Sequence, residues 1–80
     1  MAHEYQLFYR PTCPFCVKVL TFMADNDITM TMRDISSEPD ALAELIEVGG
    51  KRQVPCLFID GQPLYESSDI IARLKHDFLG

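Results

Sequence analysis

The pattern of hydrophobic and polar positions changes its period several times along the first half of the chain. Residues 5–9 form a short aromatic and aliphatic run, which is typical of a β-strand. From Phe15 to Ala24 apolar residues recur at helical spacing and also occupy other faces, so we expect a largely buried helix there. The segment from Ile28 to Ile35 alternates between apolar and polar side chains, which predicts a second strand.

The second half of the chain predicts a helix, a hairpin and a final helix. Apolar residues repeat at helical spacing from Asp40 to Val48, and two glycines end that helix. An Asp-Gly pair, which is a two-residue hairpin signal, joins a short apolar strand over 56–59 to its partner over 62–65. Polar residues at 67–69 then cap a last helix, whose apolar stripe consists of Ile70, Ile71, Leu74 and Phe78.

This order of elements, β-α-β-α-β-β-α, indicates a single α/β domain over residues 1–80. A helix separates the first two strands, so we expect them to pair in parallel, whereas the hairpin adds antiparallel strands. The result is a mixed four-stranded sheet with helices on both faces. Pro63 lacks a backbone donor, which indicates that the last strand lies at an edge of the sheet.

The charge balance narrows the classes of partner. Seven Lys and Arg residues against 12 Asp and Glu residues give a formal net charge of −5. Nucleic acids and anionic membrane surfaces both require a basic face, so we expect neither as a partner. Self-repulsion at this charge favours a monomer. No stretch is long and apolar enough to span a bilayer, and the N-terminus lacks the pattern of a secretory signal, so the expected location is the cytoplasm.

Two of the three cysteines, Cys13 and Cys16, lie close together directly after the first predicted strand. Thiols are kept reduced in the cytoplasm, so a close pair there is more often catalytic or metal-binding than a structural disulfide. A zinc site is the alternative, but structural zinc usually takes a second close pair of ligands. We therefore expect no metal, and we expect Cys56 in the core. The residues available to the zinc alternative are Cys13, Cys16 and Cys56 with His3 or His76.

The chain resembles the glutaredoxin family over nearly its whole length. The resemblance rests on "CPFC" at 13–16, "QVP" at 53–55 and "SSD" at 67–69, where glutaredoxins usually carry C-P-Y-C and T-V-P at the first two places. The string "YESSDI" at 65–70 is more similar to the glutathione-binding segment of glutathione transferase N-terminal domains. Both families imply a thioredoxin-like fold and glutathione as the ligand.

The resemblance implies that Cys13 and Cys16 carry out thiol–disulfide exchange as a redox-active pair. Cys13 follows a strand and precedes a helix, a position that stabilises a thiolate, and Arg10 adds positive charge nearby. We expect Cys13 to be the exposed nucleophile that forms a mixed disulfide and the more buried Cys16 to resolve it. The implied substrates are disulfide-containing or glutathionylated proteins, with glutathione as co-substrate and no tightly bound cofactor.

The same resemblance implies where glutathione binds. A cis peptide bond before Pro55 would let the backbone of Val54 pair with the extended tripeptide. At the start of the last helix we expect Ser67 and Ser68 to hold the γ-glutamyl carboxylate and Glu66 to hold the amino group. The glycyl carboxylate requires a cation, for which the candidates are Arg10, Lys51 and Arg52.

A different class of function also fits these motifs. The chain would then be a glutathione-binding domain without redox turnover, related to the N-terminal domain of the transferases. Transferases bind their second substrate in a helical domain, for which 80 residues leave no room. We therefore expect a glutaredoxin-type oxidoreductase that reduces protein disulfides or glutathione mixed disulfides, with a part in electron transport and in cell redox homeostasis.

Overall fold

The computed structural model describes residues 3–80 and contains one four-stranded sheet covered by helices. The predicted element order is confirmed, and a short π-helix, η1, extends the last α-helix. The elements are β1 (Tyr5–Tyr9), α1 (Pro14–Asp25), β2 (Thr31–Asp34), α2 (Pro39–Gly49), β3 (Cys56–Ile59), β4 (Gln62–Tyr65), α3 (Ser67–Leu74) and η1 (Lys75–Leu79).

The strands lie in the order β2-β1-β3-β4. The β1 and β2 strands are parallel, whereas β1 with β3 and β3 with β4 are antiparallel, so the mixed sheet is confirmed. The strand that contains Pro63 is at an edge, as its missing donor predicts. The Asp-Gly turn between β3 and β4 has φ of 51° at Asp60 and 83° at Gly61, the positive values that a tight two-residue hairpin requires.

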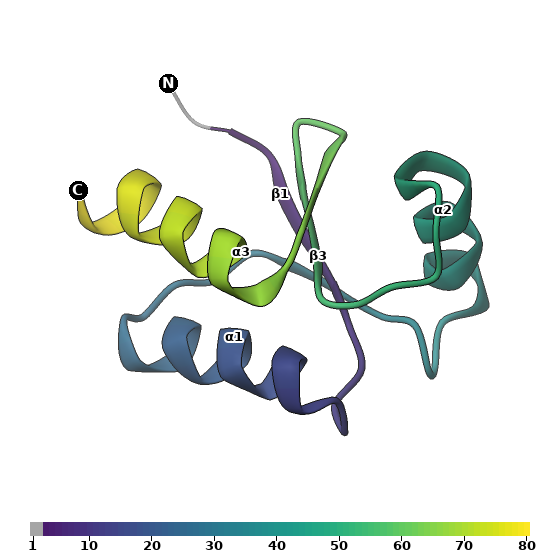
Figure 1. Ribbon diagram of the computed structural model, residues 1–80, viewed down its shortest axis with the longest axis horizontal. Helices are drawn as coiled ribbons and strands as arrows, with labels where there is room; N and C mark the ends of the chain where they lie inside the picture. The colour runs from purple at the N-terminus through teal and green to yellow at the C-terminus, as the bar shows by residue number, and fades with distance from the viewer. Residues whose placement is uncertain (1–2) are drawn as a thin grey trace.

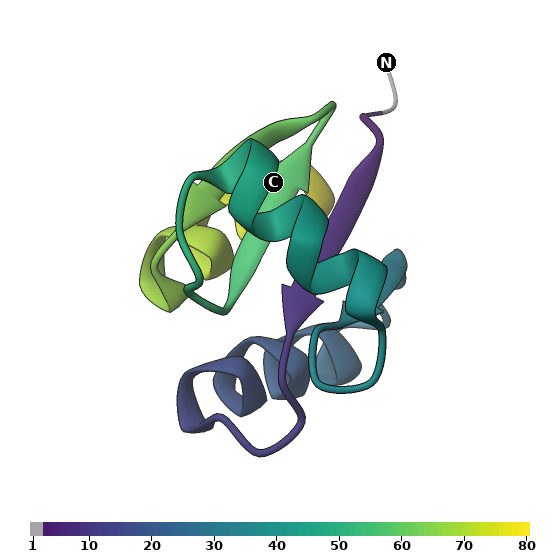
Figure 2. The same cartoon turned by 90° about the vertical axis from the view of Figure 1, so that its right-hand side faces the viewer.

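The helices form two layers on opposite faces of the sheet. Figure 1 shows α1 and α3 together on one side of the central strands and α2 on the other, and Figure 2 looks onto α2 in front of the sheet. Alternation along the strands supplies both layers with core residues, because successive side chains point to opposite faces. Leu7 and Leu57 pack with α1 and α3, whereas Phe8 and Cys56 pack with α2.

Two expectations from the pattern need correction. The first helix is not largely buried: Cys16, Val19 and Met23 are buried, but Phe15 and Val17 are 61% and 44% exposed. One face of α1 covers the sheet and packs beside α3, and nothing in residues 3–80 covers the opposite face. The second strand is shorter than its alternating pattern, since β2 begins only at Thr31. Ile28 is nevertheless buried in the core on the α1 side.

Candidate active site

Cys13 occupies the N-cap of α1, at the end of the loop that leaves β1. Its backbone is extended, with φ −82° and ψ 123°, and Pro14 follows at the first helical position, where no N–H is needed. The loop is closed by a 3.2 Å hydrogen bond in which the Cys13 N–H donates to the Arg10 carbonyl. The Cys13 side chain is half-buried. This local sequence therefore directs the N-terminus of a helix at a partly accessible sulfur.

The surroundings of Cys13 favour its ionised form. Partial burial alone would raise the pKa of this thiol, but hydrogen bonds from Cys16 and from the Phe15 N–H outweigh it, and the Arg10 charge adds to them. The net result is a pKa below the ordinary value of a cysteine. Because the thiolate is the nucleophilic form, this thiol is the one suited to attack a disulfide.

Cys16, one turn further along α1, is fully buried as predicted. The backbone N–H of Arg10 donates a hydrogen bond of 3.4 Å to its Sγ. Burial is the main reason why the pKa of Cys16 is raised to about 11, and the neighbouring Cys13 raises it further. The two thiols therefore differ in accessibility and in pKa. Cys13 has the properties of a nucleophile, and Cys16 is a thiol that stays protonated.

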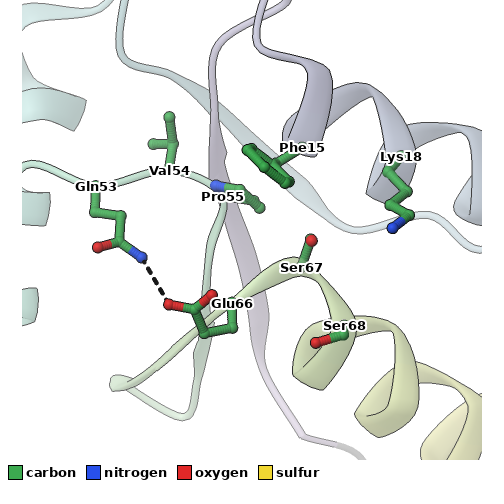
Figure 3. Close-up of a pocket in the computed structure, with 8 residues that line it drawn as sticks. All are labelled: Phe15, Lys18, Gln53, Val54, Pro55, Glu66, Ser67 and Ser68. Atoms are coloured by element: carbon green, nitrogen blue, oxygen red, sulfur yellow. Dashed lines mark hydrogen bonds between the residues drawn. The ribbon is translucent and has the colours of Figure 1, made fainter.

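A pocket of about 420 Å³ lies against the first turns of α1, and neither Cys13 nor Cys16 is among the residues that line it. Its volume lies within the range of sites for small molecules. Three segments form its walls: the first turns of α1, the loop before β3, and the junction of β4 with α3 (Figure 3). The lining residues are Phe15, Lys18, Gln53, Val54, Pro55, Glu66, Ser67 and Ser68.

The pocket collects most of the residues that the sequence predicted for glutathione. Val54, Pro55, Glu66, Ser67 and Ser68 all line it. The Val54–Pro55 peptide bond is cis, as the resemblance implied.

The three cations predicted for the glycyl carboxylate lie outside this pocket. Arg10, Lys51 and Arg52 are exposed and do not line this pocket. Arg10 lies near Cys13 instead, while the Lys51 ammonium lies over the Tyr65 ring, 4.5 Å from its centroid.

Sequence reasoning missed two polar residues of the pocket, Lys18 and Gln53. Lys18 follows Phe15 by three positions in a helix, so the two share a face of α1, and this spacing was the available signal. The Gln53 side chain donates a 3.3 Å hydrogen bond to the Glu66 carboxylate (Figure 3). That bond joins two walls of the pocket at Glu66, whose backbone has the uncommon positive φ of 73°.

The third cysteine, Cys56, directly follows the pocket residue Pro55 but faces the α2 side of the sheet. Cys56 is buried against α2, in the core as predicted, and burial raises its pKa to about 11. His3 and His76 each pair with a neighbouring aspartate, Asp60 and Asp77 respectively. Within residues 3–80 no group of three or more His, Cys, Asp and Glu side chains is placed to hold a metal ion, so the ligand set of the zinc alternative does not assemble there.

In the part of the chain that the structure describes, no helix has the length and apolar character needed to cross a membrane.

Solved structures with the same fold include glutaredoxins and transferases. Wheat glutaredoxin is 29% identical, with a TM-score of 0.69 over 95% of this chain and 74% of that chain. Oxidised glutaredoxin 2 from Chlamydomonas reinhardtii is 23% identical, with a TM-score of 0.68 over 96% and 76% of the two chains. A glutathione transferase family member from Pseudomonas fluorescens, solved with bound glutathione, is 26% identical, with a TM-score of 0.79. The chain is covered over 96% of its length in that match but spans 40% of the transferase.

The sequence itself matches one family description. No curated protein sequence matches the chain significantly. The glutaredoxin family profile matches residues 6–64, which include both thiols, the cis proline and most of the sheet. This match supports a function of the thiol–disulfide oxidoreductase type. With its thioredoxin-like fold and a profile match over most of its length, the chain belongs to the glutaredoxin family.

Proposed function

We propose that this protein is a glutathione-dependent oxidoreductase that reduces glutathione mixed disulfides and protein disulfides through Cys13 and Cys16. The observation that carries the proposal is the contrast between the two thiols. Cys13 is accessible and has a lowered pKa, whereas Cys16, one turn away, is buried with a pKa of about 11. A structural pair of core cysteines would show no such contrast.

On a glutathionylated protein the reaction has two exchange steps. The Cys13 thiolate attacks the glutathione sulfur, the existing S–S bond breaks, and the protein thiolate leaves and takes up a proton. A second glutathione, as its thiolate, then attacks the glutathione sulfur held on Cys13. This step forms glutathione disulfide and restores the Cys13 thiolate. One glutathione thiol is consumed, the disulfide bond passes from the protein to glutathione disulfide, and Cys16 takes no part in this route.

On a protein disulfide the buried thiol of Cys16 enters the reaction. Cys13 attacks one sulfur of the substrate, the substrate S–S bond breaks, and its other sulfur leaves as a thiolate that takes up a proton. Cys16 then gives up its proton and attacks the Cys13 sulfur of the mixed disulfide, whose S–S bond breaks. The second substrate thiolate leaves, and a Cys13–Cys16 disulfide remains. Two glutathione thiols reduce that disulfide in turn. Burial raises the pKa of Cys16 to about 11 and so keeps it protonated at neutral pH, which leaves Cys13 as the thiol that attacks the substrate first.

The pocket beside α1 supports glutathione as the reductant. The Val54 backbone borders the pocket next to the cis Pro55, where an extended tripeptide can add its own backbone hydrogen bonds. The Glu66 carboxylate suits an ammonium group, and the N–H groups at Ser67 and Ser68 suit a carboxylate. Arg10 and Arg52 remain the proposed partners of the glycyl carboxylate. We further propose that the protein acts as a cytoplasmic monomer.

The test is turnover of a glutathione mixed disulfide with glutathione, followed through oxidation of NADPH by glutathione reductase. We expect turnover in the parent protein and none in Cys13→Ser. Cys56→Ala removes the third thiol, which lies outside the pocket, and serves as the matched control that keeps its activity. If the parent binds glutathione but shows no turnover, the chain is a non-redox binding domain and this proposal is wrong.

A further inference from the structure

Lys18 is a cation of the pocket that no residue of the described chain neutralises. It extends from α1 toward the side of the pocket where α3 begins (Figure 3). Among residues 3–80, the ion pairs involve Arg33, Arg73, His3 and His76, but not Lys18. Lys18 is exposed to solvent, and it shares the lining of this pocket with Phe15 and Ser67.

The pocket also presents a negative charge, and its position differs from that of Lys18. The Glu66 carboxylate accepts the hydrogen bond from Gln53 and therefore lies toward the β3 side, away from Lys18 in Figure 3. One cation and one anion thus border the same 420 Å³ space from different walls. Such a distribution matches a ligand whose end carries both an ammonium and a carboxylate, the arrangement of a free α-amino acid group.

We propose that Lys18 is a specificity-determining residue that binds the α-carboxylate of the γ-glutamyl group, while Glu66 takes the adjacent ammonium. The inference rests on the proposed function, because it takes glutathione as the ligand. Lys18 then selects thiols joined to a γ-glutamyl group over other small thiols and disulfides. The reacting sulfur stays at Cys13, so Lys18 acts on binding and leaves the exchange chemistry to the two cysteines.

The chain offers a matched set of variants for this role. Lys18→Met keeps the length of the side chain and removes its charge, whereas Lys18→Arg keeps the charge. Lys75→Met removes an exposed lysine on η1, which does not line the pocket. Lys18 is exposed, so these changes leave the core intact. Each variant is assayed with the mixed disulfide of glutathione and 2-mercaptoethanol.

We expect Lys18→Met to raise the KM for the glutathione mixed disulfide about tenfold, the size of one charge-assisted hydrogen bond, with kcat nearly unchanged. Lys18→Arg and Lys75→Met should stay near the parent. The enzyme also exchanges directly with bis(2-hydroxyethyl) disulfide, which contains no γ-glutamyl group. The rate of this first exchange should be the same in all variants. A KM that does not move in Lys18→Met overturns the inference.

Modified ligands identify the carboxylate that Lys18 contacts. With 4-aminobutanoyl-Cys-Gly in place of glutathione, the α-carboxylate is missing while the amino group and peptide length remain. With this ligand the KM of the parent should rise about tenfold, and the KM of Lys18→Met should be no higher than that of the parent. With the glycyl ethyl ester of glutathione, the effect of Lys18→Met should persist in full. If the ester abolishes that effect, Lys18 binds the glycyl end and the proposed assignment is wrong.

A binding measurement separates this inference from the redox proposal. Titration calorimetry of glutathione into Cys13→Ser and into Cys13→Ser/Lys18→Met needs no turnover. A Kd that rises about tenfold with the second change supports the Lys18 contact even if the parent proves inactive as an enzyme. An unchanged Kd overturns the contact even if the parent reduces mixed disulfides rapidly.

Discussion

The backbone N–H of Arg10 donates a 3.4 Å hydrogen bond to the buried sulfur of Cys16. This contact ties the loop that precedes the nucleophile to the thiol that follows it. The Arg10 carbonyl in turn accepts from the Cys13 N–H at 3.2 Å, so both cysteines are held by one loop residue. The guanidinium of the same residue lowers the pKa of Cys13 through its charge. One short loop therefore positions the pair and tunes the reactive sulfur.

The first prediction concerns the order in which the three thiols react. Cys13 has a lowered pKa, so its rate of alkylation by iodoacetamide should reach a plateau at a lower pH than the rate for free cysteine does. Cys16 and Cys56 should remain unmodified there, because burial raises the pKa of each to about 11. Rates at each site are measured by mass spectrometry of peptides across a pH series. Equal profiles for Cys13 and Cys56 would contradict this ordering.

Cys16 should affect the two proposed reactions differently. Cys16→Ser should keep turnover of glutathione mixed disulfides within about threefold of the parent, since the two-step route needs Cys13 alone. The same variant should lose most of its activity on a protein disulfide such as that of insulin. Parallel assays with both substrates test this split. A comparable loss on both substrates would mean that Cys16 is needed for the structure of the site and not for resolution.

The Cys16 thiol should also help to hold Cys13 ionised. A hydrogen bond from Cys16 is among the contacts that lower the pKa of Cys13, and Cys16→Ala removes that side-chain donor. The alkylation profile of Cys13 in Cys16→Ala should therefore shift toward higher pH. Arg10→Gln should produce a smaller shift in the same direction, and only at low salt, because exposed charges are screened. If the alkylation profile of Cys13 is unchanged in Cys16→Ala, the Cys16 thiol does not lower the pKa of Cys13.

A separate prediction concerns stability at the end of the molecule that lies away from the thiols. The Tyr5 hydroxyl donates a 2.7 Å hydrogen bond to Asp77, which also accepts from Arg73 at 2.8 Å. Contacts with His76, Tyr5 and Arg73 hold the pKa of Asp77 far below its usual range. Tyr5→Phe should therefore cost about 1.5 kcal/mol of unfolding free energy at neutral pH. Denaturant unfolding measures this difference, and an unchanged midpoint would contradict it.

The pH dependence of that contribution follows from the direction of the shift. A carboxylate whose pKa is depressed in the folded state stabilises the fold above its unfolded pKa, about 3.9 for aspartate. The contribution is lost as the pH falls below that value toward the folded pKa of Asp77. The parent should therefore lose stability on acidification more steeply than Asp77→Asn. Thermal unfolding of both proteins over a pH series provides the measurement.

Local sequence was enough to predict the elements and the position of the thiols. Strand alternation, helical spacing and the Asp-Gly turn each depend on a few neighbouring residues, and the observed element order agrees with them. Cys13 before Pro14 marks a helix N-terminus in the same local way, so a reactive sulfur was expected there. These features required no knowledge of which segments meet in space.

Only the tertiary structure decided which side chains share the pocket and which helix face is covered. Lys18 lines the pocket while Arg10, Lys51 and Arg52 do not, although all four carry the same charge. The apolar surroundings of Val17 suggested burial, yet its side chain is 44% exposed. Periodicity says which residues share a face of one element, but not which face meets a neighbour. That choice depends on how α1 crosses the sheet beside α3, and the contacts which determine it join residues far apart in the chain.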